Sequence, residues 1–287
     1  MRVAFLCLGA MGYPMAGHLA RAGHEIAVYN RSPSKRDAWL AAHPVSRSAA
    51  SPAEAARGAD FVMACTGNDD DLREITLGPG GAFEAMAPGS CFVDHTTVSA
   101  TLARELAGEA SRRGFGFLDA PVSGGQAGAE AGALTIMVGG EAEAYERAAP
   151  LLGCYAKKQL RMGPAGSGQL TKMVNQICIA GLVQGLAEGL QFARSSGLDA
   201  GRAVEVISQG AAQSWQLDNR ALSMLEGRFD FGFAVDWMRK DLGIALDEAS
   251  RCGARLPITA LVDELYAEVQ ARGGGRLDTS SLMTLLE

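Results

Sequence analysis

Short hydrophobic runs alternate with helix-like stretches through the first half of the chain. The hydrophobic runs lie at 3–9, 25–30, 60–66, 91–96, 115–121 and 134–140. Several are hydrophobic at consecutive positions, which is typical of strands buried on both faces of a parallel sheet. Helical spacing is found at 11–22, 34–42, 53–57, 100–113 and 142–152. The alternation predicts a parallel sheet covered by helices on both sides, with a last short strand at 158–163.

The pattern changes after Gly163, where a small-residue linker, PAGSG (164–168), begins. From Gln169 to Ser195 the chain has no proline and its hydrophobic positions follow helical spacing. At about 1.5 Å per residue this stretch predicts a helix of roughly 40 Å, long enough to cross a domain boundary. Further helices are predicted at 200–209, 215–226, 235–251, 258–272 and 280–286.

These patterns predict an α/β protein of two domains. A Rossmann-type, doubly wound parallel sheet is expected over residues 1–163, and an all-α domain over 164–287, joined by the long helix. Gly181, Gly185 and Gly189 lie four apart on one face of that helix. This spacing indicates either a close helix–helix crossing or a subunit interface.

Composition and charge narrow the class of protein. A net charge of −6 argues against general nucleic-acid binding, which needs a basic surface. No run of about 18 uncharged hydrophobic residues is present, so a membrane span is not expected. The first predicted strand has no basic n-region and cleavage site ahead of it, so a leader is not expected either. The six cysteines form no CxxC pair and the four histidines are scattered. We therefore expect reduced, mostly buried thiols in a cytoplasmic protein, and no metal site.

A strand, a glycine turn and a helix open the chain in VAFLCLGAMGYPMAGHL (3–19). Gly9 and Gly12 match the last two glycines of the GxGxxG fingerprint, and Cys7 stands where the first glycine belongs. Such a turn places the N–H groups of a helix N-terminus beside a strand end, where a dinucleotide pyrophosphate binds. A purely structural turn is the alternative, and the strand–turn–helix context favours the cofactor site.

The end of the second predicted strand indicates which dinucleotide is preferred. NAD-binding sites usually have a carboxylate here, but this chain has Asn30, followed by Arg31 and Ser32. A basic, hydroxyl-bearing turn attracts a 2′-phosphate, so the sequence favours NADP(H), although neutral Asn30 is compatible with NAD(H). A solvated basic turn is the alternative. Two later strand ends, which carry Thr66 and Thr97, are expected at the same edge of the sheet, where their hydroxyl groups can approach a ribose or the nicotinamide of the cofactor.

The segment DAPVSGG (119–125) follows another predicted strand end. Ser123, Gly124 and Gly125 offer a hydroxyl and unobstructed backbone N–H groups, which can hold a substrate carboxylate. A flexible turn is the alternative.

A lysine lies near the start of the long predicted helix, in GQLTKMVNQ (168–176). Lys172 shares a helix face with Asn175 and Gln176, at i+3 and i+4. A lysine on a largely hydrophobic helix either extends to water or acts as a proton donor and acceptor. In the second case Asn175 could orient the substrate.

These stretches, together with KDLGIALDEA (240–249), resemble the β-hydroxyacid dehydrogenases. That family includes 3-hydroxyisobutyrate dehydrogenase, tartronate semialdehyde reductase (2-hydroxy-3-oxopropionate reductase) and glyoxylate/succinic semialdehyde reductases. The resemblance implies that three groups of residues contact the cofactor. The pyrophosphate would contact Gly9, Ala10, Met11 and Gly12, and the adenosine ribose and its phosphate would contact Asn30, Arg31 and Ser32. Thr97 would contact the nicotinamide ribose, and Lys240 would reach the cofactor from the helical domain.

The resemblance also implies a substrate site and an activity. Ser123, Gly124 and Gly125 would bind the carboxylate of a small 3-hydroxy acid or semialdehyde. Lys172 would be the catalytic acid/base and Asn175 would anchor substrate. In similar enzymes the helical domain mediates dimers or tetramers, so a homodimer or homotetramer is expected.

The chain departs from the family pattern at several positions. Cys7 replaces a glycine of the fingerprint, which could reduce cofactor affinity, and CTGND (65–69) replaces a turn that commonly contains leucine and proline. Trp215 and Asp236–Trp237 fall where relatives contact substrate, and packing of the tryptophans between helices is the alternative.

Three competing functions follow from these observations. An imine reductase shares the architecture but usually lacks the lysine at this helix position. A decarboxylating dehydrogenase of the 6-phosphogluconate type needs more basic residues and a longer helical domain. A dinucleotide-binding protein without catalytic activity is kept open by Cys7.

Overall fold

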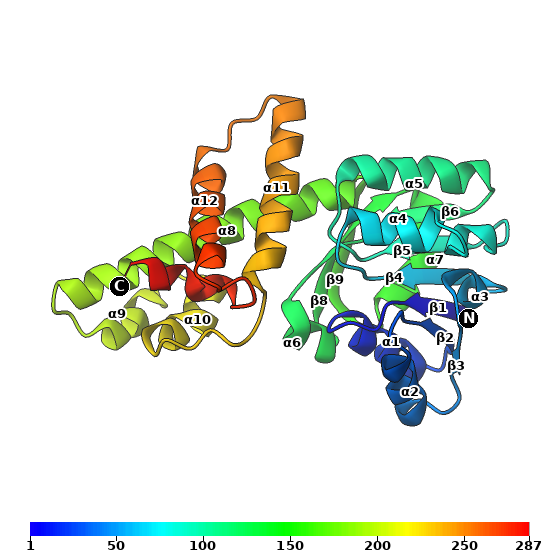
Figure 1. Ribbon diagram of the computed structural model, residues 1–287, viewed down its shortest axis with the longest axis horizontal. Coiled ribbons are helices and arrows are strands. Elements are labelled where there is room, and N and C mark those ends of the chain that lie inside the picture. Colours follow the sequence, from blue (N-terminus) through cyan, green and yellow to red (C-terminus); the bar gives the residue numbers. More distant parts are fainter. Residues whose placement is uncertain (287) are drawn as a thin grey trace. The chain divides into compact units, whose positions relative to one another are not determined.

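The computed structural model describes residues 1–286, and the chain divides into two compact units, Met1–Lys172 and Met173–Glu287 (Figure 1). Helix α8 (Ser167–Ser195) belongs to both units. The predicted domain boundary at 163/164 lies between the last strand and this helix, whereas the division between the units falls inside the helix.

The first unit contains a nine-stranded sheet in the order β3-β2-β1-β4-β5-β6-β8-β7, with β9 also paired to β8. Its strands are β1 (Arg2–Leu6), β2 (Glu25–Tyr29), β3 (Arg47–Ser48), β4 (Phe61–Ala64), β5 (Cys91–Asp94), β6 (Gly116–Asp119), β7 (Val122–Ser123), β8 (Leu134–Gly140) and β9 (Ala156–Gly163). The first six strands are parallel to one another. The predicted doubly wound α/β fold is therefore confirmed.

One edge of the sheet differs from the prediction, because β8 runs antiparallel to β6 and β7. Only the short strand β7 and the six-residue helix α6 (Gly125–Glu130) separate β6 from β8. A parallel connection needs a crossover of a dozen or more residues, usually through a helix that covers the sheet. The chain instead turns back on itself, which places residues 120–133 at the edge of the sheet rather than across its face.

Helices cover both faces of the sheet. They are α1 (Gly12–Arg21), α2 (Pro33–Ala42), α3 (Pro52–Ala56), α4 (Asp69–Leu77), α5 (Ala100–Arg112) and α7 (Ala142–Leu152), with a 3-10 turn, η1, at Ala82–Glu84. Successive residues of β1 contribute to two separate hydrophobic clusters, Val3 and Phe5 to one and Ala4 and Leu6 to the other. Because side chains of a strand alternate between faces, the two clusters are the cores on either side of the sheet.

Helix α4 was not predicted from the hydrophobic pattern. It begins with three aspartates, and the Asn68 side chain accepts a hydrogen bond from the backbone N–H of Asp71 at 2.8 Å. An asparagine cap followed by acidic residues in the first turn is a helix-start signal. This polar signal could have identified the helix where hydrophobic spacing did not.

The second unit is helical. After α8 come α9 (Ala200–Ile207), α10 (Trp215–Leu225), α11 (Val235–Cys252) and α12 (Pro257–Ala271). The helix predicted at 280–286 is a 3-10 helix, η2 (Thr279–Leu285). Helix α8 packs into two hydrophobic clusters of this unit through Ala180, Val183, Ala187 and Leu190.

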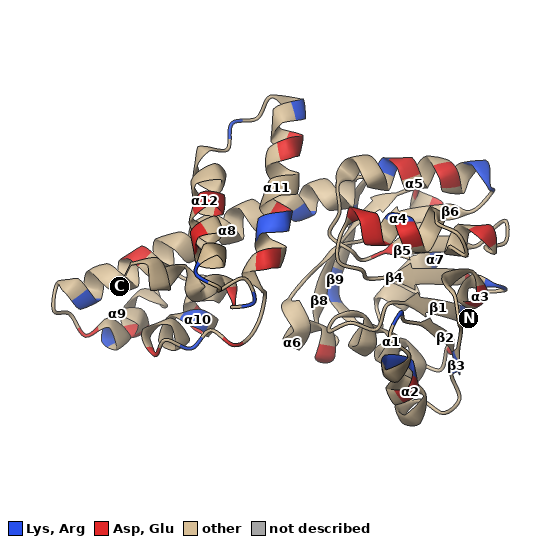
Figure 2. Cartoon of the chain, viewed as in Figure 1, with Lys and Arg blue, Asp and Glu red and all other residues tan. Residues whose placement is uncertain are grey.

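Helix α8 is long and hydrophobic, with only Lys172, Glu188 and Arg194 charged along its 29 residues (Figure 2). Among the described residues it is the one helix whose length and mean hydropathy, 1.2 over 18 residues, would allow it to cross a membrane. These three charged residues interrupt the hydrophobic sequence, so α8 contains no uncharged hydrophobic run of about 18 residues. The central helix of a folded domain has the same composition, and α8 contributes to two cores.

The predicted close crossing at the glycines of α8 is wrong. Gly185 and Gly189 are exposed, and a Cβ added to either would meet no atom within 4 Å beyond the helix's own backbone. At Gly181 an added Cβ would only touch Ile258, at 3.8 Å. The alternative, a subunit interface on this face, stays a prediction.

The expectation of mostly buried thiols is also wrong. All six cysteines are free, but only Cys91 is buried, and Cys178 and Cys252 are exposed. Three of the cysteines, Cys7, Cys65 and Cys154, follow strands or occupy a turn, where the hydrophobic pattern does not report exposure.

Candidate active site

The glycine turn after β1 packs tightly against the start of α1. A Cβ added to Gly12 would lie 2.1 Å from the Cys7 carbonyl oxygen and 3.0 Å from the Phe5 ring. A Cβ on Gly9 would meet no atom within 4 Å, so the backbone at Gly9 borders open space. The turn is therefore closed on the protein side and open at Gly9, which fits the approach of a pyrophosphate to the backbone.

Cys7 preserves the conformation of the glycine that it replaces. Its φ is 74°, and it is the only described residue other than glycine with a positive φ. This left-handed conformation is the one that favours glycine. Burial raises the pKa of the Cys7 thiol to about 12, so the side chain is neutral near pH 7 and places no negative charge beside the turn.

The Asn30 side chain at the end of β2 is engaged within the protein. Its Oδ1 accepts the Leu8 backbone N–H at 2.9 Å, and its Nδ2 donates to the Ser32 carbonyl at 3.2 Å. Asn30 thus ties the turn after β1 to the turn after β2. An adenosine ribose that contacts Asn30, as predicted, would therefore have to bind an amide group that already makes these two hydrogen bonds. Arg31 and Ser32, by contrast, are exposed.

The ends of β4 and β5 are joined by hydroxyl groups. The Thr66 backbone N–H donates to Thr96 Oγ1 at 2.9 Å, and the two hydroxyl oxygens lie 3.2 Å apart. The Thr96 N–H donates in turn to Asp94 Oδ1 at 2.9 Å. Thr66 and Thr97 are thereby held at the carboxyl edge of the parallel strands, where open α/β sheets bind ligands.

His95 is a buried residue at this edge that the sequence pattern did not single out. Its Nδ1 lies 2.7 Å from the Ala120 carbonyl oxygen and its Nε2 2.9 Å from the Tyr155 hydroxyl. Because a carbonyl only accepts, Nδ1 carries the proton and Nε2 accepts from Tyr155. The imidazole therefore links the loop after β5 to the residue that follows β6, ahead of Ser123.

We expect His95 to make the protein less stable in acid. Burial lowers its pKa to about 4 from the ordinary 6.5, so the unfolded chain binds the proton first as the pH falls. The contribution of neutral His95 to the free energy of unfolding is complete above pH 6.5. About 3 kcal/mol of it is lost as the pH falls from 6.5 to 4. Burial raises the pKa of Asp119 to about 6, so the Asp119 carboxyl has the opposite effect in nearly the same range.

A comparison of variants separates these two effects. In His95→Gln the amide can still donate to Ala120 but does not titrate. The difference in free energy of unfolding between the original protein and this variant should shrink by about 3 kcal/mol from pH 7 to pH 4. Urea unfolding at several pH values measures it, and a difference that stays constant over this range would contradict the assignment.

The Ser123 segment opens a helix rather than a simple turn. Ser123 ends β7, Gly124 has a φ of 131° and Gly125 a φ of 61°, and α6 begins at Gly125. Both glycines are exposed. The far end of α6 is tied to α1, because His18 Nε2 lies 3.0 Å from the Ala129 carbonyl oxygen. The positive φ values explain the glycines, and they leave the backbone accessible beside Ser123.

Lys172 lies in the second turn of α8 and is only 8% exposed. A side chain that merely extended into water would be largely exposed. The burial of Lys172 therefore argues against a side chain that only extends to water. The role of Lys172 as an acid/base stays a prediction.

In the second unit, a chain of polar contacts joins Asn175 to Lys240. Asn175 Nδ2 donates to Gln176 Oε1 at 2.8 Å, and Gln176 Nε2 donates to Asp241 Oδ2 at 2.6 Å. Lys240 Nζ lies 3.0 Å from Asp241 Oδ1. Gln176 and Asp241 are both 2% exposed, so this chain is a buried connection between two residues predicted to contact substrate and cofactor.

Trp215 is 54% exposed and rests on a guanidinium group. Arg220 lies 4.9 Å from the Trp215 ring and 4.6 Å from the Phe231 ring, and it pairs with buried Asp278 at 3.2 Å. The Trp215 ring is thus supported on one side and open on the other. Asp236 is engaged by Gln270 of α12 at 2.6 Å.

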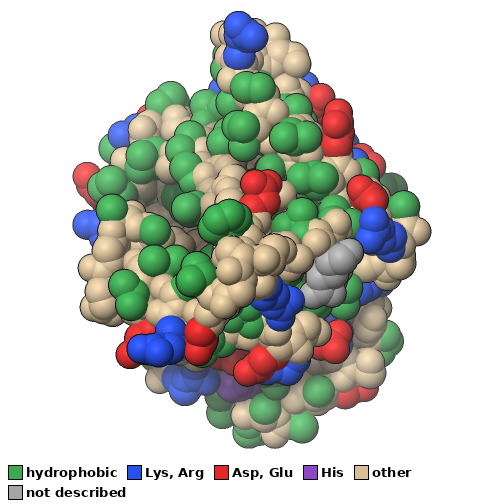
Figure 3. All heavy atoms as spheres, turned by 90° about the vertical axis from the view of Figure 1, so that its left-hand side faces the viewer, with side chains coloured by type: hydrophobic (Ala, Val, Ile, Leu, Met, Phe, Trp, Pro, Cys, Tyr) green, Lys and Arg blue, Asp and Glu red, His purple; other side chains and the backbone are tan. Residues whose placement is uncertain are grey.

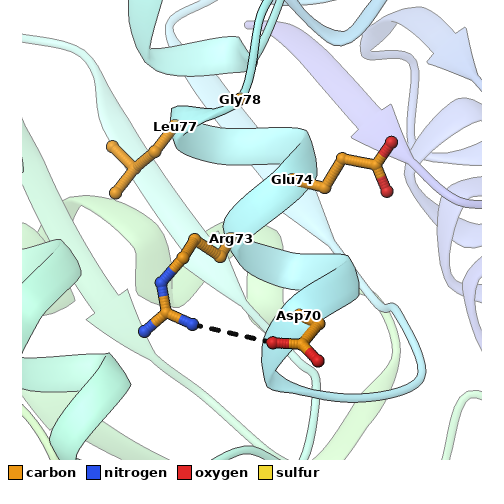
Figure 4. A pocket seen from close by; sticks show the side chains of 5 residues that line it. All are labelled: Asp70, Arg73, Glu74, Leu77 and Gly78. Carbon is orange, nitrogen blue, oxygen red and sulfur yellow. Dashed lines mark ion pairs between the residues drawn. The ribbon is translucent and has the colours of Figure 1, made fainter.

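A shallow pocket beside α4 is lined by Asp70, Arg73, Glu74, Leu77 and Gly78 (Figure 4). Arg73 points toward Asp70 at 3.9 Å and also pairs with Glu105 at 2.8 Å. Arg73, the one basic residue that lines this pocket, therefore already forms ion pairs with carboxylates. None of the predicted site residues lines the pocket. This pocket is therefore not the candidate site.

Two family models together match nearly the whole chain. The NAD binding domain of 6-phosphogluconate dehydrogenase matches residues 2–163, and the NAD-binding domain of NADP-dependent 3-hydroxyisobutyrate dehydrogenase matches residues 166–286. The 2-hydroxy-3-oxopropionate reductase of Escherichia coli is 35% identical over 100% of this chain and 97% of its own length. The chain belongs to the β-hydroxyacid dehydrogenase family. It is accordingly an NAD(P)-dependent oxidoreductase.

Other members of the family are similar in sequence and in structure. An uncharacterized oxidoreductase of Shewanella frigidimarina is 57% identical over 100% of this chain and 98% of its own length. The structure of 3-hydroxyisobutyrate dehydrogenase of Mycobacterium tuberculosis with L-serine has a TM-score of 0.90 and 32% identity, covering 100% and 99% of the two chains. An imine reductase of Pseudomonas sp. is more distant, at a TM-score of 0.64 and 20% identity, and shares the fold alone.

Proposed function

We propose that this member of the family transfers hydride between NADP(H) and a small 3-hydroxy acid or the corresponding semialdehyde, with Lys172 as the acid/base. One observation carries the proposal. Lys172 is buried on α8, and the first turn of that helix is bonded to the loop after β5, which carries Thr97, and to the end of β6, which leads to Ser123. Thr97, Ser123 and Lys172 thus belong to one bonded framework within the first unit.

The proposed roles follow from the chemistry of each group. When bound, the nicotinamide supplies or accepts the hydride. The Ser123 hydroxyl and the backbone N–H groups of Gly124 and Gly125 hold the substrate carboxylate. In reduction the Lys172 ammonium donates a proton to the developing alkoxide, and its charge stabilises that oxygen. In oxidation the neutral amine removes the hydroxyl proton.

A substrate screen tests this proposal. Purified protein is assayed with NADPH or NADH against glyoxylate, succinic semialdehyde, tartronate semialdehyde and methylmalonate semialdehyde. The oxidation arm uses NADP⁺ or NAD⁺ with 3-hydroxyisobutyrate and L-serine. The relatives support this choice, because they include a 2-hydroxy-3-oxopropionate reductase and a 3-hydroxyisobutyrate dehydrogenase whose structure was solved with L-serine. Turnover of an imine but of none of these compounds would favour the imine reductase instead.

We expect Arg31→Ala to change the preference between the two dinucleotides. Arg31 is exposed beside Ser32, and loss of a charged hydrogen bond to a 2′-phosphate costs about 1.5–3 kcal/mol. The KM for NADPH should therefore rise by about tenfold or more, while the KM for NADH stays nearly constant. Arg255→Ala, at an exposed position of the other unit, is the control. An equal effect on both cofactors would contradict the predicted preference for NADP(H).

We also propose a homodimer through the exposed hydrophobic face of the second unit. Figure 3 looks onto this helical end and shows hydrophobic side chains over much of its surface. On α8 the exposed side chains include Val174 at 60%, Leu182 at 46% and Phe192 at 70%, on the side where Gly185 and Gly189 are open. Large exposed hydrophobic patches are typical of interaction surfaces. Sedimentation equilibrium tests this proposal, and a monomer at micromolar concentration would contradict it.

A further inference from the structure

The start of α8 is bound to the end of β6 by a buried carboxylate. Asp119, the last residue of β6, is 0% exposed. Its Oδ1 accepts the Gly166 backbone N–H at 2.8 Å, and its Oδ2 accepts the Gln169 backbone N–H at 2.9 Å. The first N–H groups of a helix have no partner within the helix, and a negative charge is favourable there. Asp119 satisfies this helix end from the sheet.

The side chain of Gln169 ties the same helix turn to a second strand end. Gln169 is 0% exposed, and its Nε2 donates to the Thr96 carbonyl at 2.7 Å. Its Oε1 accepts the Val98 backbone N–H at 3.2 Å. These two bonds bracket Thr97, the residue predicted to contact the nicotinamide ribose. One helix turn is therefore bonded to the ends of both β5 and β6.

Two glycines allow close packing around Asp119. A Cβ added to Gly139 of β8 would lie 2.4 Å from Asp119 Oδ1. A Cβ added to Gly168 would lie 2.5 Å from the carbonyl oxygens of Asp119 and Met137. The two glycines allow the helix start to rest directly on the backbone of β6 and β8, in direct contact with the carboxylate.

A structural cap alone would not need a charged group here. The carboxylate's hydrogen-bond partners are backbone N–H groups, and a neutral asparagine or serine also caps helices. Burial is unfavourable for the ionised form, and it raises the pKa of Asp119 to about 6. A fully buried carboxylate kept at this cost beside a predicted site is a candidate for a functional role.

We propose that Asp119 is a positioning residue, whose carboxylate holds the α8 turn that carries Lys172 against the strand ends that lead to Thr97 and Ser123. The proposal rests on the function proposed above for Lys172. Lys172 follows Gln169 by three residues, which is about one helical turn, so a displaced first turn would displace the amine. Proton transfer depends steeply on such placement.

The test compares two aspartate caps in the full-length protein. Asp119→Asn keeps the shape but sets an amide N–H₂ against a backbone N–H that donates. We expect kcat to fall 10- to 50-fold with a KM for the dinucleotide within threefold of the original value, and a larger primary deuterium isotope effect because the chemical step slows. The matched control is Asp199→Asn, where Asp199 caps α9 by accepting the Arg202 N–H at 3.1 Å. That variant should keep kcat within twofold.

Other outcomes separate the possible failures. An unchanged kcat and isotope effect in folded Asp119→Asn, while Lys172→Ala is inactive, would overturn the positioning role alone. An active Lys172→Ala would overturn the proposed function, and this inference with it. If Asp119→Asn does not fold, Gln169→Leu decides, since it removes the side-chain bonds to Thr96 and Val98 but keeps the backbone bond to Asp119. That variant should lower kcat at least fivefold with the same pattern, and an original kcat would overturn the proposal.

Discussion

Lys172→Ala is expected to lower turnover by at least about 10²-fold, within the range for loss of a general acid/base. The amine lies on a buried part of α8, and the preceding turn of that helix is bonded to two strand ends. Water would have to protonate the alkoxide without a fixed positive charge beside it. Binding of the dinucleotide should change little, because the predicted pyrophosphate site lies at the turn after β1.

Steady-state turnover with NADPH and the best substrate of the screen measures this effect. Lys157→Ala, an exposed lysine on β9, is the matched control and should keep the original turnover. Lys172→Arg retains a positive charge but cannot give up its proton near pH 7, so it should also be strongly impaired. Near-normal turnover of Lys172→Ala with an intact fold would remove Lys172 from the mechanism.

Gly12→Ala is expected to have the second large effect, on folding and on cofactor binding together. Its new Cβ would lie 2.1 Å from the Cys7 carbonyl oxygen, which is backbone and cannot rotate away. The strand end and the start of α1 must then move apart. We expect the free energy of unfolding to fall by about 1–3 kcal/mol and the affinity for NADPH to fall by at least about 10²-fold.

Gly9→Ala is the matched variant, three residues earlier in the same turn. A Cβ there meets no protein atom within 4 Å, so the free energy of unfolding should stay nearly constant. If the pyrophosphate approaches this backbone, the affinity for NADPH should nevertheless fall. Urea unfolding and fluorescence titration with NADPH separate the two effects. A Gly12→Ala protein with the original stability and affinity would contradict the tight turn.

Local patterns predicted most of the fold because they report local physics. Consecutive hydrophobic residues in β1 bury Val3 and Phe5 on one face of the sheet and Ala4 and Leu6 on the other. The glycine turn and the long helix were likewise visible from spacing over a few residues. The antiparallel β8 was not, because its direction depends on how the segment after Asp119 folds back against the sheet.

The candidate site shows the same division. Thr66 and Thr97 were predicted at the sheet edge, since the carboxyl ends of parallel strands meet there. The inward bonds of Asn30 and the buried links of His95 were not predicted. The partners of His95 lie 25 and 60 residues away in sequence, and hydrophobic periodicity gives no information on such polar contacts.

The sequence by itself determined most of the strands and helices along the chain, the resemblance to the family and the kinds of side chain available at each strand end. It did so because hydrophobic spacing and glycine turns act through neighbours along the chain. Only the tertiary structure decided that Cys7 adopts the conformation of a glycine, that Asp119 and Gln169 anchor the start of α8, and that Lys172 is buried. Burial and hydrogen bonding between distant residues exist only once the sheet and the helix have packed together.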